Sequence, residues 1–170
     1  MPIVPAQAPD IPLLVRLVNG AYRGTDGVKG WTDESHLLEG ARTDAGGILE
    51  LMNDAHSVIL KYIDPEKRVA GCVYLQKRGD RLYLGLLSVL PELQGTGLGK
   101  DLLAAADDHA RESHCLHIYI TVISARHELV AWYERHGYQR TGETEPFHAG
   151  EKFGIQKQPL ELIVLVKNLS

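Results

Sequence analysis

The 170-residue sequence contains little cysteine, and its two cysteines, Cys72 and Cys115, lie far apart. Neither belongs to a C-x-x-C pair, so the sequence offers no zinc-binding or thioredoxin-like motif. Two isolated thiols are typical of reduced core residues in a cytosolic protein, which favours a cytoplasmic location. The eight histidines form no H-x-x-x-H or H-E-x-x-H pattern. We therefore expect no metal site.

A long apolar run and an excess of positive charge are also missing. The apolar run near the end, Leu-Ile-Val-Leu-Val at 162–166, is far too short to cross a bilayer. The first ten residues, MPIVPAQAPD, lack the basic and apolar regions of a signal peptide. Eighteen Lys and Arg against 22 Asp and Glu give a formal charge of −4, whereas a nucleic-acid binder needs a clustered basic face. We expect neither a membrane nor a nucleic acid as partner.

Length and composition are those of one globular domain spanning residues 1–170, with 44% hydrophobic and 24% charged residues. Runs with helical and with alternating periodicity predict an α/β domain on a mixed sheet. The expected elements are a strand at 3–4, a helix at 10–22, helices between 32 and 52 interrupted near Gly46, strands at 56–62, 69–76 and 81–89, a helix at 98–111, a strand at 116–123, a helix at 126–136 and strands at 138–142 and 160–167.

A glycine-rich turn between the expected strand 81–89 and the expected helix from Leu98 is the most informative segment. It reads Leu-Pro-Glu-Leu-Gln-Gly-Thr-Gly-Leu-Gly-Lys over residues 90–100. Glycines let a ligand approach the backbone, and the first N–H groups of a helix have no intrahelical partner. Together with the helix dipole they suit a phosphate or pyrophosphate group. The segment therefore predicts a phosphorylated ligand.

Two familiar phosphate-binding motifs do not fit this turn. A Walker A loop ending at Gly99-Lys100 would need glycine where Gln94 stands and serine or threonine where Asp101 stands. A G-x-G-x-x-G dinucleotide motif that starts at Gly95 meets Lys100 where its last glycine belongs. The sequence thus disfavours an NTPase and a dinucleotide-binding enzyme.

The pattern that does fit is Q-x-x-G-x-G, formed by Gln94, Gly97 and Gly99. It resembles the acyl-CoA loop of the GNAT superfamily of N-acetyltransferases. A second segment, Tyr-Glu-Arg-His-Gly-Tyr at 133–138, is similar to the later helix and strand of that superfamily. The resemblance covers about residues 82–140. It implies a mixed central sheet with splayed strands in the order β-α-α-β-β-β-α-β-α-β-β.

The resemblance implies that acetyl-CoA binds between two splayed strands, here the strand ending at Val89 and the strand 116–123. Backbone groups of three residues would contact the pantetheine and polarise the thioester carbonyl: Leu87, Ser88 and Val89. Backbone N–H groups of the following turn would hold the pyrophosphate: Gln94, Gly95, Thr96, Gly97, Leu98, Gly99 and Lys100.

Tyr133 aligns with the tyrosine that similar enzymes use as general acid for the departing CoA thiolate. A phenol of ordinary pKa near 10 keeps its proton at neutral pH and can donate it. The alternative is a core aromatic on the same helix. The strand 81–87 carries no Asp or Glu as general base, which leaves Tyr83, a water chain, Glu34 or a histidine.

Arg126 stands seven residues before Tyr133, where similar enzymes usually carry asparagine. It is interpreted as a contact to a substrate carboxylate or to CoA, or as a solvated charge at the start of a helix. Trp31 and Glu34 lie in the region that forms the acceptor wall of similar enzymes. We count Trp31, Glu34, Tyr83 and Arg126 as candidate substrate residues.

The resemblance implies transfer of acetyl from acetyl-CoA to a primary amine by direct attack in a ternary complex. Neither motif contains a cysteine that would form an acyl-enzyme. The alternative is a non-catalytic, regulatory module that binds acyl-CoA. The acceptor would be a small-molecule or peptide amine, and the acidic balance favours a cationic one. Similar enzymes are often homodimers.

Overall fold

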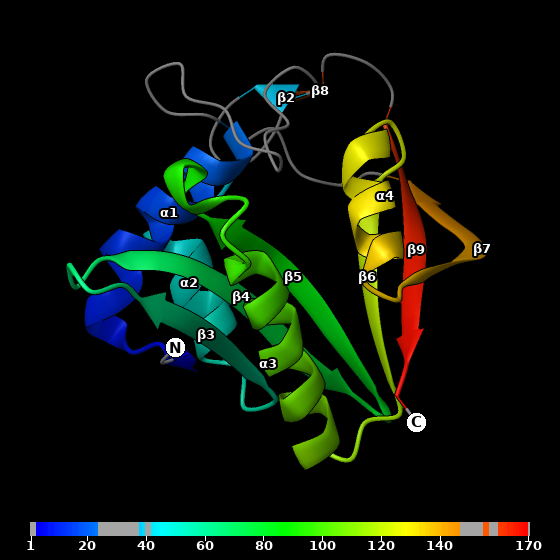
Figure 1. Ribbon diagram of the computed structural model, residues 1–170, viewed down its shortest axis with the longest axis horizontal. Helices are drawn as coiled ribbons and strands as arrows, with labels where there is room; N and C mark the ends of the chain where they lie inside the picture. The colour runs from blue at the N-terminus through cyan, green and yellow to red at the C-terminus, as the bar shows by residue number, and fades with distance from the viewer. Residues whose placement is uncertain (1–2, 24–37, 40–41, 147–154, 157–159, 170) are drawn as a thin grey trace.

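The computed structural model describes residues 3–23, 38–39, 42–146, 155–156 and 160–169. These form nine strands, four α-helices and two short 3-10 helices (Figure 1). In chain order they are β1 (Ile3–Pro5), η1 (Ala8–Asp10), α1 (Ile11–Arg23), β2 (Leu38–Glu39), α2 (Ala45–Met52), β3 (Ser57–Ile63), β4 (Val69–Arg78), β5 (Arg81–Val89), η2 (Pro91–Leu93), α3 (Leu98–Glu112), β6 (His117–Ile123), α4 (His127–Arg135), β7 (Gln139–Pro146), β8 (Ile155–Gln156) and β9 (Glu161–Asn168).

Seven of the strands form one mixed sheet in the order β1-β3-β4-β5-β6-β9-β7. All neighbouring pairs are antiparallel except β5 and β6, which run parallel. The crossover between these two parallel strands contains α3, as a parallel connection requires. Strands β2 and β8 pair with each other in a separate small sheet.

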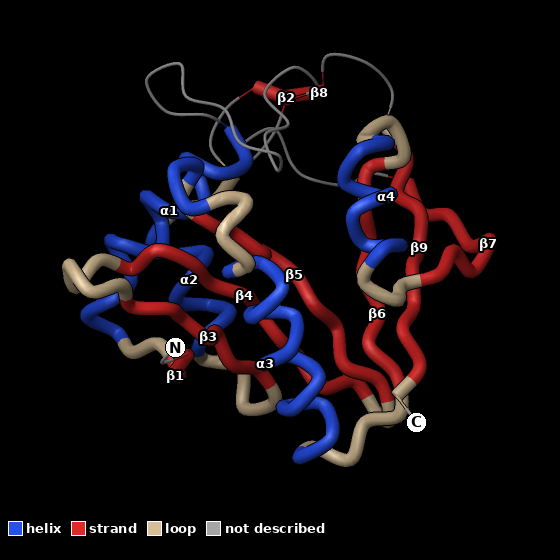
Figure 2. Tube along the Cα trace, viewed as in Figure 1, coloured by secondary structure: helices blue, strands red, loops and turns tan. Residues whose placement is uncertain are grey.

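The helices cover both faces of the sheet (Figure 2). Helices α1 and α2 pack with β3, β4 and β5 on one face around Leu14, Val18 and Ile48. Helices α3 and α4 pack on the other face, where a larger cluster joins Leu102 and Val130 to residues of β3, β4, β5, β6 and β9. No helix among the described residues is long and apolar enough to cross a membrane.

The two central strands separate after a short shared stretch, and this confirms the expected splay. Strands β5 and β6 pair only at Arg81–His117, Leu82–Ile118 and Tyr83–Tyr119. Residues 84–89 of β5 and 120–123 of β6 have no pairing with each other, although β6 continues to pair with β9 as far as Ile123. The ribbons diverge from this shared end (Figure 1).

The expected mixed α/β fold is confirmed, with a correction between residues 32 and 52. Leu38 and Glu39 belong to a strand that pairs with β8, not to a helix. The helix there begins at Ala45, because the Asp44 carboxylate accepts the Gly47 N–H at 2.7 Å and caps it. Gly46 and Gly47 lie in its first turn and do not interrupt it. Residues 24–37 lie outside the described part.

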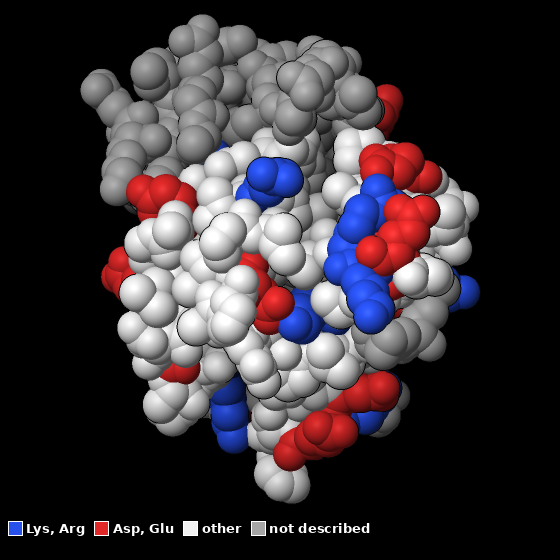
Figure 3. All heavy atoms as spheres, turned by 90° about the vertical axis from the view of Figure 1, so that its left-hand side faces the viewer, with Lys and Arg blue, Asp and Glu red and all other residues white. Residues whose placement is uncertain are grey.

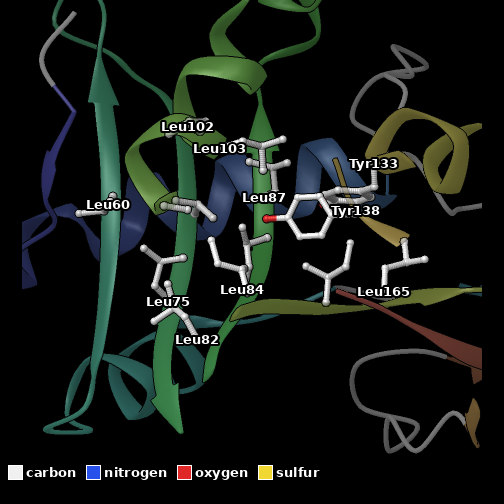
Figure 4. Close-up of a cluster of buried hydrophobic side chains, with 14 of the residues drawn as sticks. Leu60, Leu75, Leu82, Leu84, Leu87, Leu102, Leu103, Tyr133, Tyr138 and Leu165 are labelled. Carbon is white, nitrogen blue, oxygen red and sulfur yellow. The ribbon is translucent and has the colours of Figure 1, made fainter. Parts of the chain in front are cut away.

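Two tyrosines of the 133–138 segment fill the core where the sheet divides (Figure 4). The Tyr133 and Tyr138 rings lie edge to face, with centroids 5.6 Å apart. Tyr138 is 1% exposed and lies beside Leu84 and Leu87 of β5. Burial and the nearby Asp107 carboxylate raise the pKa of Tyr138, and its hydroxyl has no hydrogen-bond partner among the described residues. This aromatic packing supports the two halves of the sheet from the α3 and α4 side.

Replacing Tyr138 by phenylalanine should therefore leave the free energy of unfolding unchanged or raise it by about 1 kcal/mol, since an unsatisfied buried hydroxyl is removed. Replacement by alanine should lower it by about 3–5 kcal/mol, because the aromatic ring is lost from a packed core. Urea denaturation of the three proteins measures both changes. A phenylalanine variant that is less stable by more than about 1 kcal/mol would show that the hydroxyl is bonded.

Candidate functional site

The splayed end of β5 leaves backbone groups available on the side that faces β6. From residue 84 to residue 89, β5 is paired with β4 on one side, and among the described residues no strand pairs with it on the other. Backbone N–H and C=O groups need hydrogen-bond partners when they are removed from water. An extended ligand with amide groups can supply these partners. The arrangement is that of a site that receives such a ligand as an additional strand.

A β-bulge shapes the same segment of β5. The register shifts between Cys72 and Tyr74 of β4, so that β5 holds one extra residue. Leu86 takes a φ of +51°, a left-handed conformation that costs a branched or bulky residue strain. Its carbonyl accepts hydrogen bonds from the Ser88 hydroxyl at 2.9 Å and the Cys72 thiol at 3.6 Å. These bonds hold the bulge and change the direction of the backbone groups at residues 87–89.

The glycine-rich turn lies between a strand and a helix as predicted: β5 ends at Val89, the short η2 follows, and the glycines lead into α3. Gly95 and Gly97 have φ values of +81° and +91°, which only glycine adopts without strain. Gly97 is the N-cap of α3 and provides no side-chain cap. The first N–H groups of α3, from Leu98 to Lys100, therefore point out of the helix without intrahelical acceptors. They form a ready site for an anion.

Two of the predicted donors in this turn already bond within it. The Gln94 N–H donates to the Pro91 carbonyl and the Thr96 N–H donates to the Leu93 carbonyl, each at 3.3 Å. The Gln94 side chain donates to the Val89 carbonyl at 3.4 Å, which ties the turn to the end of β5. The structure thus brings the predicted residues 87–100 into one continuous strand end, turn and helix start.

A glycine in β4 sets how closely the start of α3 approaches the sheet. A Cβ atom at Gly71 would lie 3.1 Å from Leu102 and 3.2 Å from Leu98, both in α3. Leu98 is 3% exposed and Leu102 is fully buried. Gly71 also pairs with Val89, the last residue of β5. The close packing therefore fixes the helix N-terminus beside the splayed strand end.

Tyr133 lies in α4 and is 5% exposed. Burial raises its pKa well above the ordinary value, the nearby phenols of Tyr22, Tyr138 and Tyr83 raise it further, and the Arg126 charge lowers it. The net effect keeps the phenol protonated at neutral pH. Tyr22, Tyr83 and Arg126 belong to α1, β5 and the start of α4, so distant parts of the sequence contribute to the electrostatic environment of Tyr133.

The structure describes two of the four candidate substrate residues, Arg126 and Tyr83. Arg126 is the N-cap of α4 and is 7% exposed, so it is a buried charge near Tyr133 and not a solvated one. Tyr83 lies on the α1 and α2 face of β5, and its ring covers Gly85, whose added Cβ would lie 3.0 Å away. Trp31 and Glu34 lie outside the described residues.

Comparison with known proteins decides the family. The profile of the acetyltransferase (GNAT) family matches residues 20–138, most of the chain. The chain belongs to the GNAT acetyltransferase family. A curated relative, acetyltransferase Atu2258 of Agrobacterium fabrum, is 33% identical over 70 residues. This match spans 41% of the GNAT chain described here and half the length of that relative.

Solved structures of GNAT enzymes share the fold over nearly the whole chain. The ribosomal-protein-S18-alanine N-acetyltransferase of Escherichia coli is 15% identical, with a TM-score of 0.72 over 99% of this chain and 94% of that one. The ribosomal-protein-alanine N-acetyltransferase of Brucella melitensis is 24% identical, with a TM-score of 0.71 over 99% of this chain and all of that one. At these identities the likeness concerns the fold.

Two features of this GNAT site have no clear sequence signal. The bulge at Leu86 falls in a plain run of apolar strand residues, and Tyr22 approaches Tyr133 only through the packing of α1. A leucine within an apolar strand sequence does not predict a left-handed backbone conformation. Among the described residues, no three His, Cys, Asp or Glu side chains come together as metal ligands. On the face shown in Figure 3, basic and acidic side chains are interspersed.

Replacing Gly71 by valine should displace the start of α3 and weaken binding of acetyl-CoA about tenfold, with a loss of about 1–3 kcal/mol in stability from overpacking. Calorimetric titration and urea denaturation measure the two effects. Gly46→Ala is a matched control, because its Cβ would meet only Asp44 at an ordinary 3.5 Å. Unchanged affinity in the valine variant would show that the α3 N-terminus does not bind this ligand.

Proposed function

We propose that this GNAT protein transfers an acetyl group from acetyl-CoA directly to a primary amine. The observation that carries the proposal is the unpaired edge of β5 at residues 84–89, directly continuous with the glycine-rich turn. An extended pantetheine chain has amide groups for such an edge, and the pyrophosphate fits the open N-terminus of α3. The residues present thus fit both parts of the ligand.

The chain's own groups supply positioning and polarisation. Backbone N–H groups in the segment Leu87, Ser88 and Val89, redirected by the bulge, would donate to the thioester carbonyl, where negative charge develops as the amine attacks. Bound acetyl-CoA supplies the activated acyl group. Holding acetyl-CoA and the amine in one site removes the entropic cost of bringing them together from solution during the reaction.

Tyr133 is proposed to deliver a proton to the sulfur that leaves. The amine nitrogen forms a bond to the acyl carbon, the carbon–sulfur bond breaks, and the nitrogen loses a proton while the thiolate gains one. A phenol with a raised pKa is fully protonated at neutral pH and is ready to supply that proton. Arg126 beside it is a buried positive charge that would stabilise negative charge on the sulfur.

Direct attack is favoured because both cysteines are poor nucleophiles. Burial raises the pKa of Cys72 to about 12 and also raises the pKa of Cys115. Only the thiolate is nucleophilic, so both stay inert near neutral pH. Cys72 is moreover engaged with the Leu86 carbonyl at the bulge. These properties support a reaction without an acyl-enzyme.

Calorimetric titration with acetyl-CoA, and with ATP and NAD as controls, tests the ligand assignment first. We expect binding of acetyl-CoA alone, followed by release of free CoA thiol when a panel of amines is added. Binding without turnover of any amine would identify a non-catalytic acyl-CoA-binding module. Absence of acetyl-CoA binding would refute the proposal, because residues 94–100 would then be only a tight connection.

Tyr133→Phe should lower kcat about tenfold or more, as loss of a general acid does, while the affinity for acetyl-CoA stays within about twofold. The protonated phenol is the active form, so activity would be lost only as pH rises through the Tyr133 pKa. Because that pKa is raised, kcat of the unaltered protein should show no tyrosine-dependent decline between pH 7 and 10. Full activity of the phenylalanine variant would remove Tyr133 from the mechanism.

A further inference from the structure

A polar groove of about 540 Å³ crosses the sheet on the face that carries α2. Its size is within the range of sites for small ligands. The floor consists of Tyr74, Tyr83 and Tyr119 from β4, β5 and β6. The walls are acidic, with Glu50 on α2, Asp54 just after that helix, and Glu143 and Glu145 on β7. Acidic walls repel a polyanion such as a nucleic acid. The part of a ligand that lies between these walls is therefore neutral or positively charged.

Two arginines at one end of the groove form an unusual pair. Arg78 and Arg81 stand directly opposite each other across the β4–β5 hairpin, an arrangement in which like charges repel. Neither has a carboxylate within 4.0 Å among the described residues, whereas Arg68, Arg111 and Arg140 each have at least one. Asp54 attracts Arg78 from beyond that distance, so the repulsion is offset only in part. A ligand anion would neutralise it.

Hydrogen bonds and aromatic rings hold the two guanidinium groups in place. Arg78 donates to Gln76 at 2.5 Å and to the Tyr119 hydroxyl at 2.6 Å, and its guanidinium lies 4.5 Å from the centre of the Tyr83 ring. The Arg81 guanidinium lies 4.6 Å from the centre of the Tyr119 ring. A guanidinium has five N–H donors, so Arg78 retains three beyond these two bonds. Stacked guanidiniums with spare donors suit a carboxylate.

Tyr83 connects this groove to the proposed reaction site. Its ring lines the groove and extends along β5 over Gly85, which has no side chain to obstruct it. Leu87 lies six residues beyond Arg81 along β5, a distance of about 20 Å in an extended strand. An extended peptide spans this distance with about six residues. Fewer residues are needed because the arginine side chains extend toward the peptide.

We infer that the acceptor is a peptide amine whose chain lies in this groove, with a carboxylate about five residues from the acetylated nitrogen bound by Arg78 and Arg81. This inference rests on the proposed function, because it places the amine beside the thioester. The acidic walls accept backbone amides or basic side chains of the peptide. The tyrosine floor supports its extended backbone.

Two series of amidated heptapeptides test the inference. Each begins with alanine and contains glycine spacers, with one glutamate in the first series and one glutamine in the second, placed at each position from 3 to 7. The measurements are release of CoA thiol on acetylation and calorimetric binding to the protein saturated with CoA. We expect the glutamate peptides near position 5 to exceed their glutamine partners about five- to tenfold in kcat/KM and in affinity.

Arg81→Gln and Arg78→Gln should each reduce the rate on the best glutamate peptide toward that on its glutamine partner. Arg111→Gln, on the outer surface of α3 beside Asp108, is the matched control and should keep the preference. Arg78 donates hydrogen bonds to Gln76 and Tyr119, whereas Arg81 donates to neither. Arg81→Gln therefore tests carboxylate recognition without the loss of the Tyr119 bond that Arg78→Gln causes. Thermal unfolding of each variant checks that it is folded.

Failure of the inference and failure of the proposed function give different results. If acetyl-CoA does not bind, the proposed function fails and the inference fails with it. If acetyl-CoA binds but neither series shows a glutamate preference at any position, or no peptide is bound or acetylated, the arginine site is refuted and the proposed function stands. A preference that survives both arginine substitutions also refutes the site.

Discussion

The separation of β5 from β6 after three residue pairs is the constraint on which the rest of the structure depends. Parallel strands that continued together would satisfy each other's backbone and leave no edge for a ligand. Aromatic side chains pack on both faces near the point of separation, Tyr133 and Tyr138 on the α3 and α4 side and the paired Tyr83 and Tyr119 on the other. Large rings fill the volume that a diverging sheet would otherwise leave empty.

Backbone geometry at the open end completes the site. The bulge at Leu86 adds one residue to β5, and two side chains hold its carbonyl, so the strain is distributed over a fixed network. Gly71 allows α3 to pack closely on β4, which places the helix N-terminus beside the end of β5. Strand edge, turn and helix start thus act together, although each is unremarkable alone.

Local sequence patterns predict the elements near the motif well and the distant contacts poorly. The strand ending at Val89, the glycines with positive φ and the helix from Leu98 follow from residues adjacent in the chain. The pairing of β2 with β8 joins residues more than a hundred positions apart, and no local pattern around Leu38 signals it. The electrostatic influence of Tyr22, Tyr83 and Arg126 on Tyr133 depends on the fold in the same way.

The short β5–β6 ladder also has a consequence for how a bound ligand would affect the backbone of the sheet. Among the described residues, the β5–β6 ladder covers only Arg81–Tyr83, with one more backbone bond beside it from the Leu116 N–H to the Asp80 carbonyl. Beyond this end, side chains connect the two parts of the sheet. A ligand bound along residues 84–89, as we propose, would take the position of the missing strand and extend the ladder across the sheet. The amide hydrogens of that segment would then exchange with solvent more slowly. The exchange rates of these amide hydrogens would therefore report whether the proposed site is occupied.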